Sequence, residues 1–471
     1  MTVEEDRLEL RLPDDDDASL PQSVPFAELM IHGGGFEDVV PILRAALDTT
    51  TSAEEAGQVA AEHGSRLWRA AVDRAQGRVE RGNLPASDDR PLYWTRVLAL
   101  LTIRLWPGPD LTAQERDHLR DAFDRASRGM TDIDFPDGRA RVLVGGFDPY
   151  TLDGGDTGTT ADAAGNNLRH GNPSGAAALA LDGTSHTRPD GTEARIEAYI
   201  LPVRYTAFDR GYLEDTVGPW MRSGPKQVHA SLTLSQGGGS EFHLEEFNAR
   251  YRGARADNEG VTPAAPVDGR PQLATDNPDA NIQIPVRLGG RETFDLHDPP
   301  QWTRASLPVE QMIAASSGAD VTRPPRSTWP DGTVAYGVVW NTRFTEFPEP
   351  SSSERVARND PVPHEYPPPE APVEPSAGSA SYRGGGGNYL SNESAYRNTL
   401  LRDRMGLDIP AGHIHTPDMQ HFGSDFAISD DTFDVTRRAI VQQAVALVRV
   451  VGDLVPATRP GWTQGPLDSG H

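Results

Sequence analysis

An alternation of short apolar runs with helical segments after residue 137 constrains the fold of this chain more than any other feature. Ala140 to Val144 is a short apolar run that ends in a pair of glycines, which is typical of a buried strand. Two further strands are predicted at Ala194–Leu201 and Val228–Ser235, and an Ala- and Leu-rich helix that begins near Ser174 separates the first strand from the second. Strands that alternate with helices predict an α/β fold, here a three-layer αβα sandwich around a mostly parallel sheet.

The 471 residues leave room for further parts on both sides of this domain. Residues 1–22 include the acidic run Asp14 to Asp17, and we expect them to be a disordered tail. Residues 23–135 are predicted to form an all-helical extension, because capping-box patterns at Ser52 and Thr112 precede apolar residues at helical spacing.

The α/β domain itself is predicted to span residues 136–460, followed by a flexible C-terminus at 461–471. A Pro-rich insertion at about 315–380 interrupts it; Trp329 to Phe347 within the insertion has the pattern of a hairpin. Val435 to Val450 is predicted to be an amphipathic helix that covers one face of the sheet.

Composition excludes several classes of function. The chain has no cysteine, which excludes disulfides, thiolate metal sites and a cysteine nucleophile. Its net charge of −25 predicts a surface that repels nucleic acid and anionic membranes, so neither is an expected partner. No apolar run has the length of a membrane span, and the N-terminus is acidic, so we expect a soluble, cytoplasmic protein.

A glycine run followed by a serine is the strongest functional signal. Gly384 to Gly387 lead through a short apolar step to Ser391 and then to a predicted helix. Ser391 therefore lies at or near a helix N-terminus, where unpaired N–H groups and the helix dipole stabilise an anion, and such positions suit a nucleophile. The simpler alternative is that Ser391 is the N-cap of an ordinary helix.

Two histidines and a glycine-rich loop offer partners for this serine. His413 and His415 lie on the same face of a predicted strand, and the spacing from Ser391 allows a histidine to return beside the serine. The glycine-rich loop after Gln236 leads into an acidic element that includes Glu241, Glu245 and Glu246, and the candidate orienting acid lies in this stretch. Because open α/β sheets collect their sites at the carboxyl ends of strands, we expect the site in the loops after Val144, Ser235 and Ile414.

A metal site is the alternative interpretation of the histidines. His413 and His415 together with His421 would supply three ligands, but no carboxylate or further histidine stands at a firm spacing. We therefore expect neither a metal nor another cofactor.

Seven short motifs resemble, in the same order, those of the pyroglutamyl-peptidase I family of cysteine peptidases. The resemblance covers about residues 139–450 and leaves the helical extension and the Pro-rich insertion unexplained. The motifs are Gly146-Phe147-Asp148-Pro149-Tyr150, Asn172-Pro173-Ser174, Leu244-Glu245 beyond the Gln236 loop, Asp257-Asn258-Glu259-Gly260, Ser306-Leu307-Pro308, Tyr389-Leu390-Ser391-Asn392 and Ile414-His415-Thr416-Pro417.

The resemblance implies a hydrolase that removes N-terminal pyroglutamate from peptides and works as a homo-oligomer. It assigns the nucleophile to Ser391, the base to His415 and the orienting acid to Glu245. It also implies that Phe147 and Tyr150 flank the lactam ring, that Gln236 lies in the pocket wall, and that Asn172 contributes to the substrate site.

The chain departs from the family pattern in two ways. Serine stands where the family has cysteine, and a hydroxyl is not ionised near neutral pH, so Ser391 would depend fully on its base. Two arginines that the family usually has near the site are replaced by Ser240-Glu241 and Glu246. These departures leave two alternatives open: a catalytically impaired homologue that acts as a binding protein, and a serine amidase or esterase of other specificity.

Overall fold

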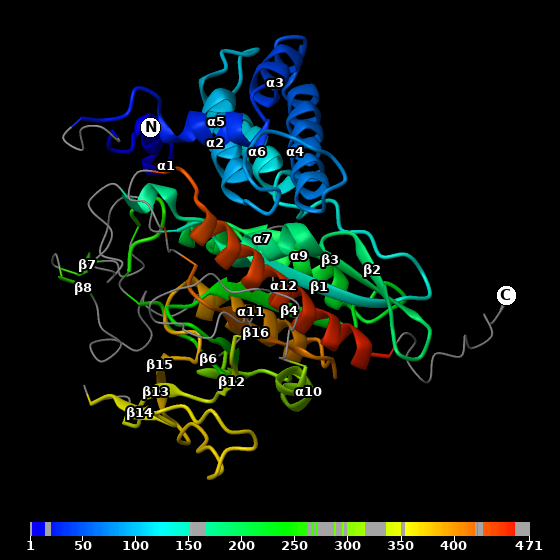
Figure 1. Cartoon of the computed structure of the whole chain (residues 1–471), viewed down its shortest axis with the longest axis vertical. Coiled ribbons are helices and arrows are strands. Elements are labelled where there is room, and N and C mark those ends of the chain that lie inside the picture. The colour runs from blue at the N-terminus through cyan, green and yellow to red at the C-terminus, as the bar shows by residue number, and fades with distance from the viewer. Residues whose placement is uncertain are drawn as a thin grey trace.

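The fold was analysed on a computed structural model of the chain, which has a helical N-terminal part lying against a larger α/β part (Figure 1). The structure describes residues 2–14, 20–150, 152, 166–253, 255–261, 299–315, 336–349, 354–419, 422 and 427–456, together with the backbone of the two-residue strands between residues 266 and 295. The predicted flexible C-terminus at 461–471 lies outside these residues.

A seven-stranded sheet forms the centre of the α/β part, in the order β12-β5-β16-β4-β1-β3-β2. Among its neighbouring pairs, β12–β5, β16–β4, β4–β1 and β1–β3 are parallel, whereas β5–β16 and β3–β2 are antiparallel. The prediction of a mostly parallel sheet is therefore confirmed. The strands are β1 (Ala140–Phe147), β2 (Thr184–Thr187), β3 (Glu193–Leu201), β4 (Ala230–Gln236), β5 (Phe242–Glu245), β12 (Val338–Asn341) and β16 (Ala411–Thr416).

Helices cover both faces of this sheet, so the three-layer prediction is also confirmed (Figure 1). Alternate residues of β1 point to opposite layers: Val142 and Val144 pack with the core of one face, and Leu143 packs with the other. The first face is covered by α7 (Pro173–Leu181) and α12 (Asp431–Leu454), and the second by α9 (Tyr212–Met221) and α11 (Leu390–Arg404). The shorter helices are η2 (Asn166–Arg169), α8 (Tyr205–Asp209) and α10 (Val309–Ala314).

The N-terminal part is helical, as predicted. Its helices are α2 (Phe26–Gly34), α3 (Val39–Leu47), α4 (Ala53–Ala75), α5 (Arg90–Leu105) and α6 (Ala113–Ala126). The capping box at Thr112 is complete. At Ser52 only half of the box forms, because the Glu55 carboxylate accepts from the backbone N–H of Thr51 instead (2.8 Å).

The prediction that residues 1–22 are disordered is wrong for residues 2–14. Helix α1 (Val3–Asp6) and the 3-10 turn η1 (Arg7–Glu9) lie against the rest of the molecule with Glu4, Glu5 and Arg7 buried. The acidic residues are ordered because they have cationic partners: Glu5 pairs with Arg104 at 2.9 Å. Most of the Asp14 to Asp17 run lies outside the described residues.

The predicted hairpin at Trp329 to Phe347 is also wrong where the structure describes it. Strand β12 joins the central sheet beside β5, whereas β13 (Phe344–Phe347) belongs to a separate three-stranded sheet with β14 (Val356–Arg358) and β15 (Ala380–Arg383). The remaining short strands are β6 (Phe247–Ala249) with β11 (Trp302–Arg304), β7 (Pro266–Val267) with β8 (Arg270–Pro271), and β9 (Arg287–Leu288) with β10 (Phe294–Asp295). Within the described residues, no helix has the length and apolar character needed to cross a membrane.

Candidate active site

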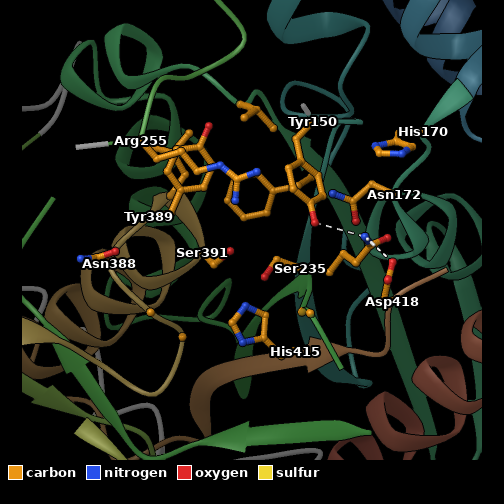
Figure 2. A pocket seen from close by; sticks show the side chains of 18 of the residues that line it. Tyr150, His170, Asn172, Ser235, Arg255, Asn388, Tyr389, Ser391, His415 and Asp418 are labelled. Atoms are coloured by element: carbon orange, nitrogen blue, oxygen red, sulfur yellow. Dashed lines mark hydrogen bonds between the residues drawn. The ribbon is translucent and has the colours of Figure 1, made fainter. Parts of the chain in front are cut away.

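A pocket of about 440 Å³ opens at the carboxyl ends of the parallel strands. Phe147 at the end of β1 and Gln236 at the end of β4 line it. Tyr150 follows β1, and His415 and Asp418 come from the end of β16 and the residues after it (Figure 2). These are the loops in which the sequence predicted the site, and their meeting follows from the shared direction of the three strands.

Ser391 enters the pocket from the first turn of α11. The helix begins at Leu390 and its N-cap is Tyr389, so Ser391 is the second helical residue rather than the N-cap. The first helical hydrogen bond runs from Glu393 N to Tyr389 O (3.1 Å). The backbone N–H groups of residues 390–392 therefore precede the helical ladder and can stabilise an anion beside the Ser391 hydroxyl.

The glycine run exists because the backbone passes very close to the candidate acid. A Cβ atom at Gly385 would lie 1.9 Å from Glu245 Oε2, and one at Gly386 would lie 3.5 Å from the His415 Cε1 atom. Gly384 and Gly387 exchange two backbone hydrogen bonds (2.8 and 3.0 Å), which hold the loop in a tight turn. Side chains are absent here to allow close packing around the site.

His415 and Glu245 form a short, buried contact. The His415 Nδ1 atom lies 2.8 Å from Glu245 Oε1, and Glu245 is only 1% exposed. Glu245 is paired in register with His413, so its side chain reaches His415 diagonally across the two strands. A carboxylate at this distance favours a proton on Nδ1 and leaves Nε2 to act on the pocket side.

Ser391 and His415 both line the pocket, and Figure 2 shows the two side chains on the same side of it. Within the described part of the chain, no hydrogen bond joins these two side chains. Nucleophile and base commonly come into contact only when substrate is bound.

Glu245, not Glu246, is the acid that faces the histidine. Glu246 accepts a hydrogen bond from Trp340 Nε1 (2.9 Å) and pairs with Arg304, so it serves the opposite face of the strand. Asn341 supports Glu245: its Nδ2 atom donates to Glu245 Oε2 (2.8 Å) and lies 3.3 Å from the Gly385 carbonyl oxygen. The sequence analysis missed Asn341 because the hairpin interpretation placed this residue away from Glu245.

His413 has a structural role. Its ring is fully buried, and its two nitrogen atoms each lie 2.8 Å from a hydroxyl, of Thr233 and of Ser235. Burial and the neighbouring His415 hold the pKa of His413 well below its usual range, so the ring is neutral. The described residues contain no group of three side chains suited to bind a metal, and His421 lies outside them.

The far wall of the pocket is a polar chain of three side chains. Gln236 Nε2 lies 3.1 Å from both the Tyr150 hydroxyl and Asp418 Oδ1 (Figure 2). Burial and the nearby Asp418 raise the pKa of Tyr150 to about 12, so the phenol keeps its proton. Phe147 provides the apolar counterpart and stacks on Phe208 with a centroid distance of 6.2 Å.

Asn172 lines the pocket, but its side chain already has partners within the protein. Its Oδ1 atom accepts hydrogen bonds from the backbone N–H and the hydroxyl of Ser174, so Asn172 is the N-cap of α7. Its Nδ2 atom donates to the Asp148 carbonyl oxygen (2.9 Å). Asn172 therefore shapes the wall of the pocket.

Positive charge also reaches the pocket from residues that the sequence analysis did not select. Arg255 lies over the rings of Tyr150 (5.5 Å) and Tyr389 (5.3 Å), and Arg383 lines the same pocket. The resemblance had indicated lost arginines at Ser240-Glu241 and Glu246. No motif marks Arg255 itself; its place follows from Tyr150 and Tyr389, which stand in two separate motifs and whose rings an arginine packs on readily.

The fold and the pocket together define a three-layer α/β protein with a pocket at the carboxyl ends of its parallel strands and a helical N-terminal part. Two family models match the chain, the PA0049 N-terminal domain over residues 1–124 and the PA0049 C-terminal domain over residues 141–420. An uncharacterized protein, PA0049 of Pseudomonas aeruginosa, is 41% identical over an alignment of 502 residues that covers 96% of this chain and 89% of the relative. The chain belongs to the PA0049 family.

Two solved structures of pyroglutamyl peptidase I from Bacillus amyloliquefaciens are more distant matches. One aligns with a TM-score of 0.32 and 17% identity over 66% of this chain and 98% of the peptidase. The other gives 0.33 and 16% over 66% of this chain and 95% of the peptidase. Similarity at this level does not support an argument about function. Any such argument comes from the geometry of the site.

Proposed function

We propose that this protein is a serine hydrolase that cleaves the amide bond after an N-terminal pyroglutamyl residue of a peptide. The observation that carries the proposal is one pocket lined by both Ser391, in the first turn of a helix, and His415, whose Nδ1 atom lies 2.8 Å from Glu245. A nucleophile, a base and an orienting acid in this order constitute a catalytic triad.

The proposed reaction has two halves. His415 Nε2 takes the proton of Ser391 as the serine Oγ attacks the carbonyl carbon, and the N–H groups at the start of α11 stabilise the resulting oxyanion. The imidazolium, stabilised by Glu245, then protonates the leaving amine as the C–N bond breaks. Water enters, loses a proton to His415 and hydrolyses the acyl ester, which returns the serine hydroxyl.

The pocket chemistry suits a small polar ring. A lactam has one N–H donor and one carbonyl acceptor; the Asp418 carboxylate can accept from the N–H, and the protonated Tyr150 hydroxyl can donate to the carbonyl. Phe147 and Tyr150 supply aromatic surface on the same side. A neutral ring with one donor and one acceptor can therefore bind both the polar groups and the aromatic surface of this pocket.

The proposal is tested with a pyroglutamyl-coumarin amide. Native protein should release the coumarin, and Ser391→Ala should lower kcat by at least about a thousand-fold, because the proposed acyl ester forms on the Ser391 hydroxyl. Robust turnover by Ser391→Cys together with none by native protein would exclude the serine as nucleophile and retain only the scaffold.

Two alternatives give different results with native protein. A serine amidase or esterase of other specificity would be labelled at Ser391 by a fluorophosphonate without turning over the pyroglutamyl substrate. A binding protein would resist labelling but gain thermal stability with free pyroglutamate, because a ligand that binds only the folded state stabilises it.

A further inference from the structure

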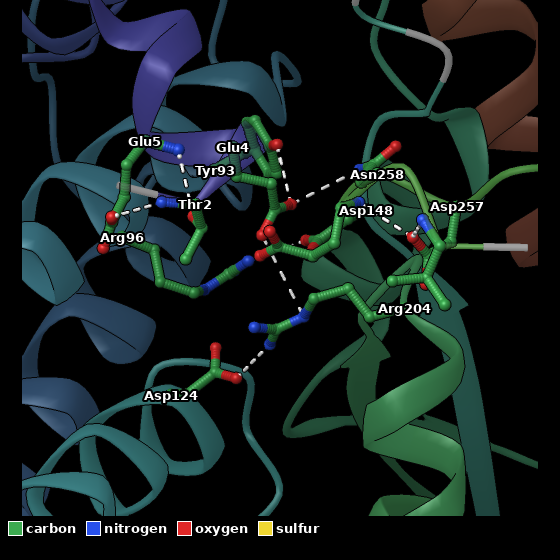
Figure 3. A network of polar contacts seen from close by, with 12 residues as sticks. Thr2, Glu4, Glu5, Tyr93, Arg96, Asp124, Asp148, Arg204, Asp257 and Asn258 are labelled. Carbon is green, nitrogen blue, oxygen red and sulfur yellow. Dashed lines mark hydrogen bonds and ion pairs between the residues drawn. The ribbon is translucent and has the colours of Figure 1, made fainter. Parts of the chain in front are cut away.

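The N-terminal part reaches the loop that forms one wall of the pocket. We propose that the segment Thr2–Leu12 and helix α5 position the backbone of Phe147–Tyr150, which makes the helical part a working component of the site (Figure 3). The kinetic consequences rest on the proposed function, whereas the positioning itself does not.

The first contact holds the middle of this loop by its side chain. Arg96 of α5 donates from Nη1 to Asp148 Oδ1 (2.7 Å), and both side chains are at most 2% exposed. Arg128, just after α6, pairs with the other oxygen of Asp148. Because Asp148 follows Phe147 directly and precedes Tyr150 by two residues, a buried ion pair with the helical part fixes the chain between two pocket residues.

The second contact holds the loop by its backbone through Asn258. The Asn258 Nδ2 atom donates to the Pro149 carbonyl oxygen (2.9 Å) and lies 3.4 Å from Glu4 Oε1 (Figure 3). Arg7 Nη1 donates to the Asn258 carbonyl oxygen (2.7 Å). Asn258 is only 2% exposed, so α1 and η1 set the position of an amide that satisfies a carbonyl of the pocket loop.

Glu4 is itself held on the helical side. Its Oε1 atom accepts from the Tyr93 hydroxyl of α5 (2.9 Å), and Arg204 lies 4.0 Å from its other carboxylate oxygen. Glu4 is therefore held by a hydrogen bond from the helical side and by an arginine of the α/β part, and the carboxylate connects α5 to Asn258.

The third contact acts through Asn172. Asp89, at the N-terminus of α5, accepts the backbone N–H of Asn172 through Oδ2 (2.8 Å). Asn172 in turn donates to the Asp148 carbonyl oxygen. Two consecutive carbonyl groups of the pocket loop, of Asp148 and Pro149, are thus satisfied by amides whose positions are set by the N-terminal part.

Variants of Glu4 in the full-length protein test this inference. In Glu4→Ala, amide hydrogen exchange of the peptide that contains residues 147–150 should rise about ten-fold, because one buried contact that restrains Asn258 is lost. KM for the pyroglutamyl-coumarin amide should rise by a similar factor with kcat within about two-fold. The matched control is Glu9→Ala, which removes an exposed carboxylate from the same segment.

A milder variant guards against misfolding. Tyr93→Phe removes only the hydroxyl that holds Glu4, and it should change exchange and KM in the same direction by a smaller factor. Exchange and KM at native values in a folded Glu4→Ala protein would overturn the positioning role, as would equal effects of Glu9→Ala. If native protein turns over no substrate, the proposed function fails, and the exchange measurement alone still decides the positioning.

Discussion

Two adjacent carboxylates, Glu245 and Glu246, have different roles because β5 alternates its side chains between two faces. Glu245 faces His415, and Glu246 faces Trp340 and Arg304. A one-residue shift in the pairing of β5 with β16 would exchange them, so the register of three residue pairs decides which one is the candidate acid.

This assignment predicts the effects of two neighbouring substitutions. Glu245→Ala should lower kcat for the pyroglutamyl-coumarin amide by about a hundred- to ten-thousand-fold, since His415 loses the group that sets its tautomer and stabilises its charge. Glu246→Ala should leave kcat within about three-fold. Steady-state kinetics on both proteins checks the assignment, and the reverse order of effects would make Glu246 the acid.

Asp89 leads to a prediction about pH. Burial, and then the neighbouring Asp88, raise its pKa from 3.8 to about 7, and its Oδ1 atom is buried without a hydrogen-bond partner. The folded state therefore binds this proton more tightly than the unfolded chain, so stability decreases as pH rises from about 4 to about 7. At about 1.4 kcal/mol per pKa unit, the free energy of unfolding falls by on the order of 4 kcal/mol over this pH range.

Asp89→Asn should remove this dependence, because an amide oxygen can still accept from Asn172 N–H without carrying charge. Denaturant unfolding at pH 5 and pH 8 should show that the variant gains stability relative to native protein at the higher pH. Asp110→Asn, at an exposed position, is the control. A constant difference between native protein and Asp89→Asn at both pH values would contradict the prediction.

The residues of the candidate site differ in how far sequence could predict them. Ser391, His415 and Glu245 each stand in a short motif beside glycines or strand ends, and the structure brings all three together. Asn341 and Arg255 lack such a signal. Their roles depend on which strand or ring lies next to them, and that is set by tertiary packing.

At the scale of elements, the loop Gly384–Gly387 connects the three-stranded sheet to α11 and passes close to both Glu245 and His415. Gly385→Ala would place a methyl group against the Glu245 carboxylate, so either the loop or the acid must move. We expect kcat to fall by at least about ten-fold, with a loss of stability of about 1–3 kcal/mol. Gly239→Ala, where a Cβ meets nothing within 4 Å, should be close to neutral in kinetics and thermal unfolding.

Elements with an unambiguous period were predicted well, and short ones were not. The strands β1, β3 and β4 and the helix α12 lie where their apolar patterns indicated. The segment with β12 and β13 was misread because two short apolar runs with a tight connection look the same whether they pair with each other or join different sheets.

At the scale of the whole molecule, the helical and α/β parts share buried charges, which should make them unfold together. Arg96→Ala would leave Asp148 buried with one cationic partner fewer, and we expect a loss of about 3 kcal/mol. Calorimetry of native protein should show one transition, and the variant should show it at lower temperature. Arg66→Ala, which breaks the exposed pair with Glu62, should change stability by less than about 1 kcal/mol, and two separate native transitions would refute the coupling.

The N-terminal segment shows why amino-acid composition alone does not predict whether a chain end is ordered. An acidic segment near a chain end has the composition of a disordered tail, but composition does not show which charges form ion pairs in the folded protein. Glu4 and Glu5 are ordered because arginines from distant parts of the chain, including Arg104 and Arg204, meet them. Such long-range pairing has no local pattern.

The position of β16 has a consequence for synthesis on the ribosome. This strand is the last of the sheet to be made, yet it joins the β12–β5 pair to the strands β4, β1, β3 and β2. A nascent chain that ends before residue 411 holds the β12–β5 pair and the strands β4, β1, β3 and β2 without the strand that joins them, and it lacks His415. The sheet and the pocket can therefore be completed only after β16 has been made, and until then the edges of β5 and β4 stay unpaired on that side.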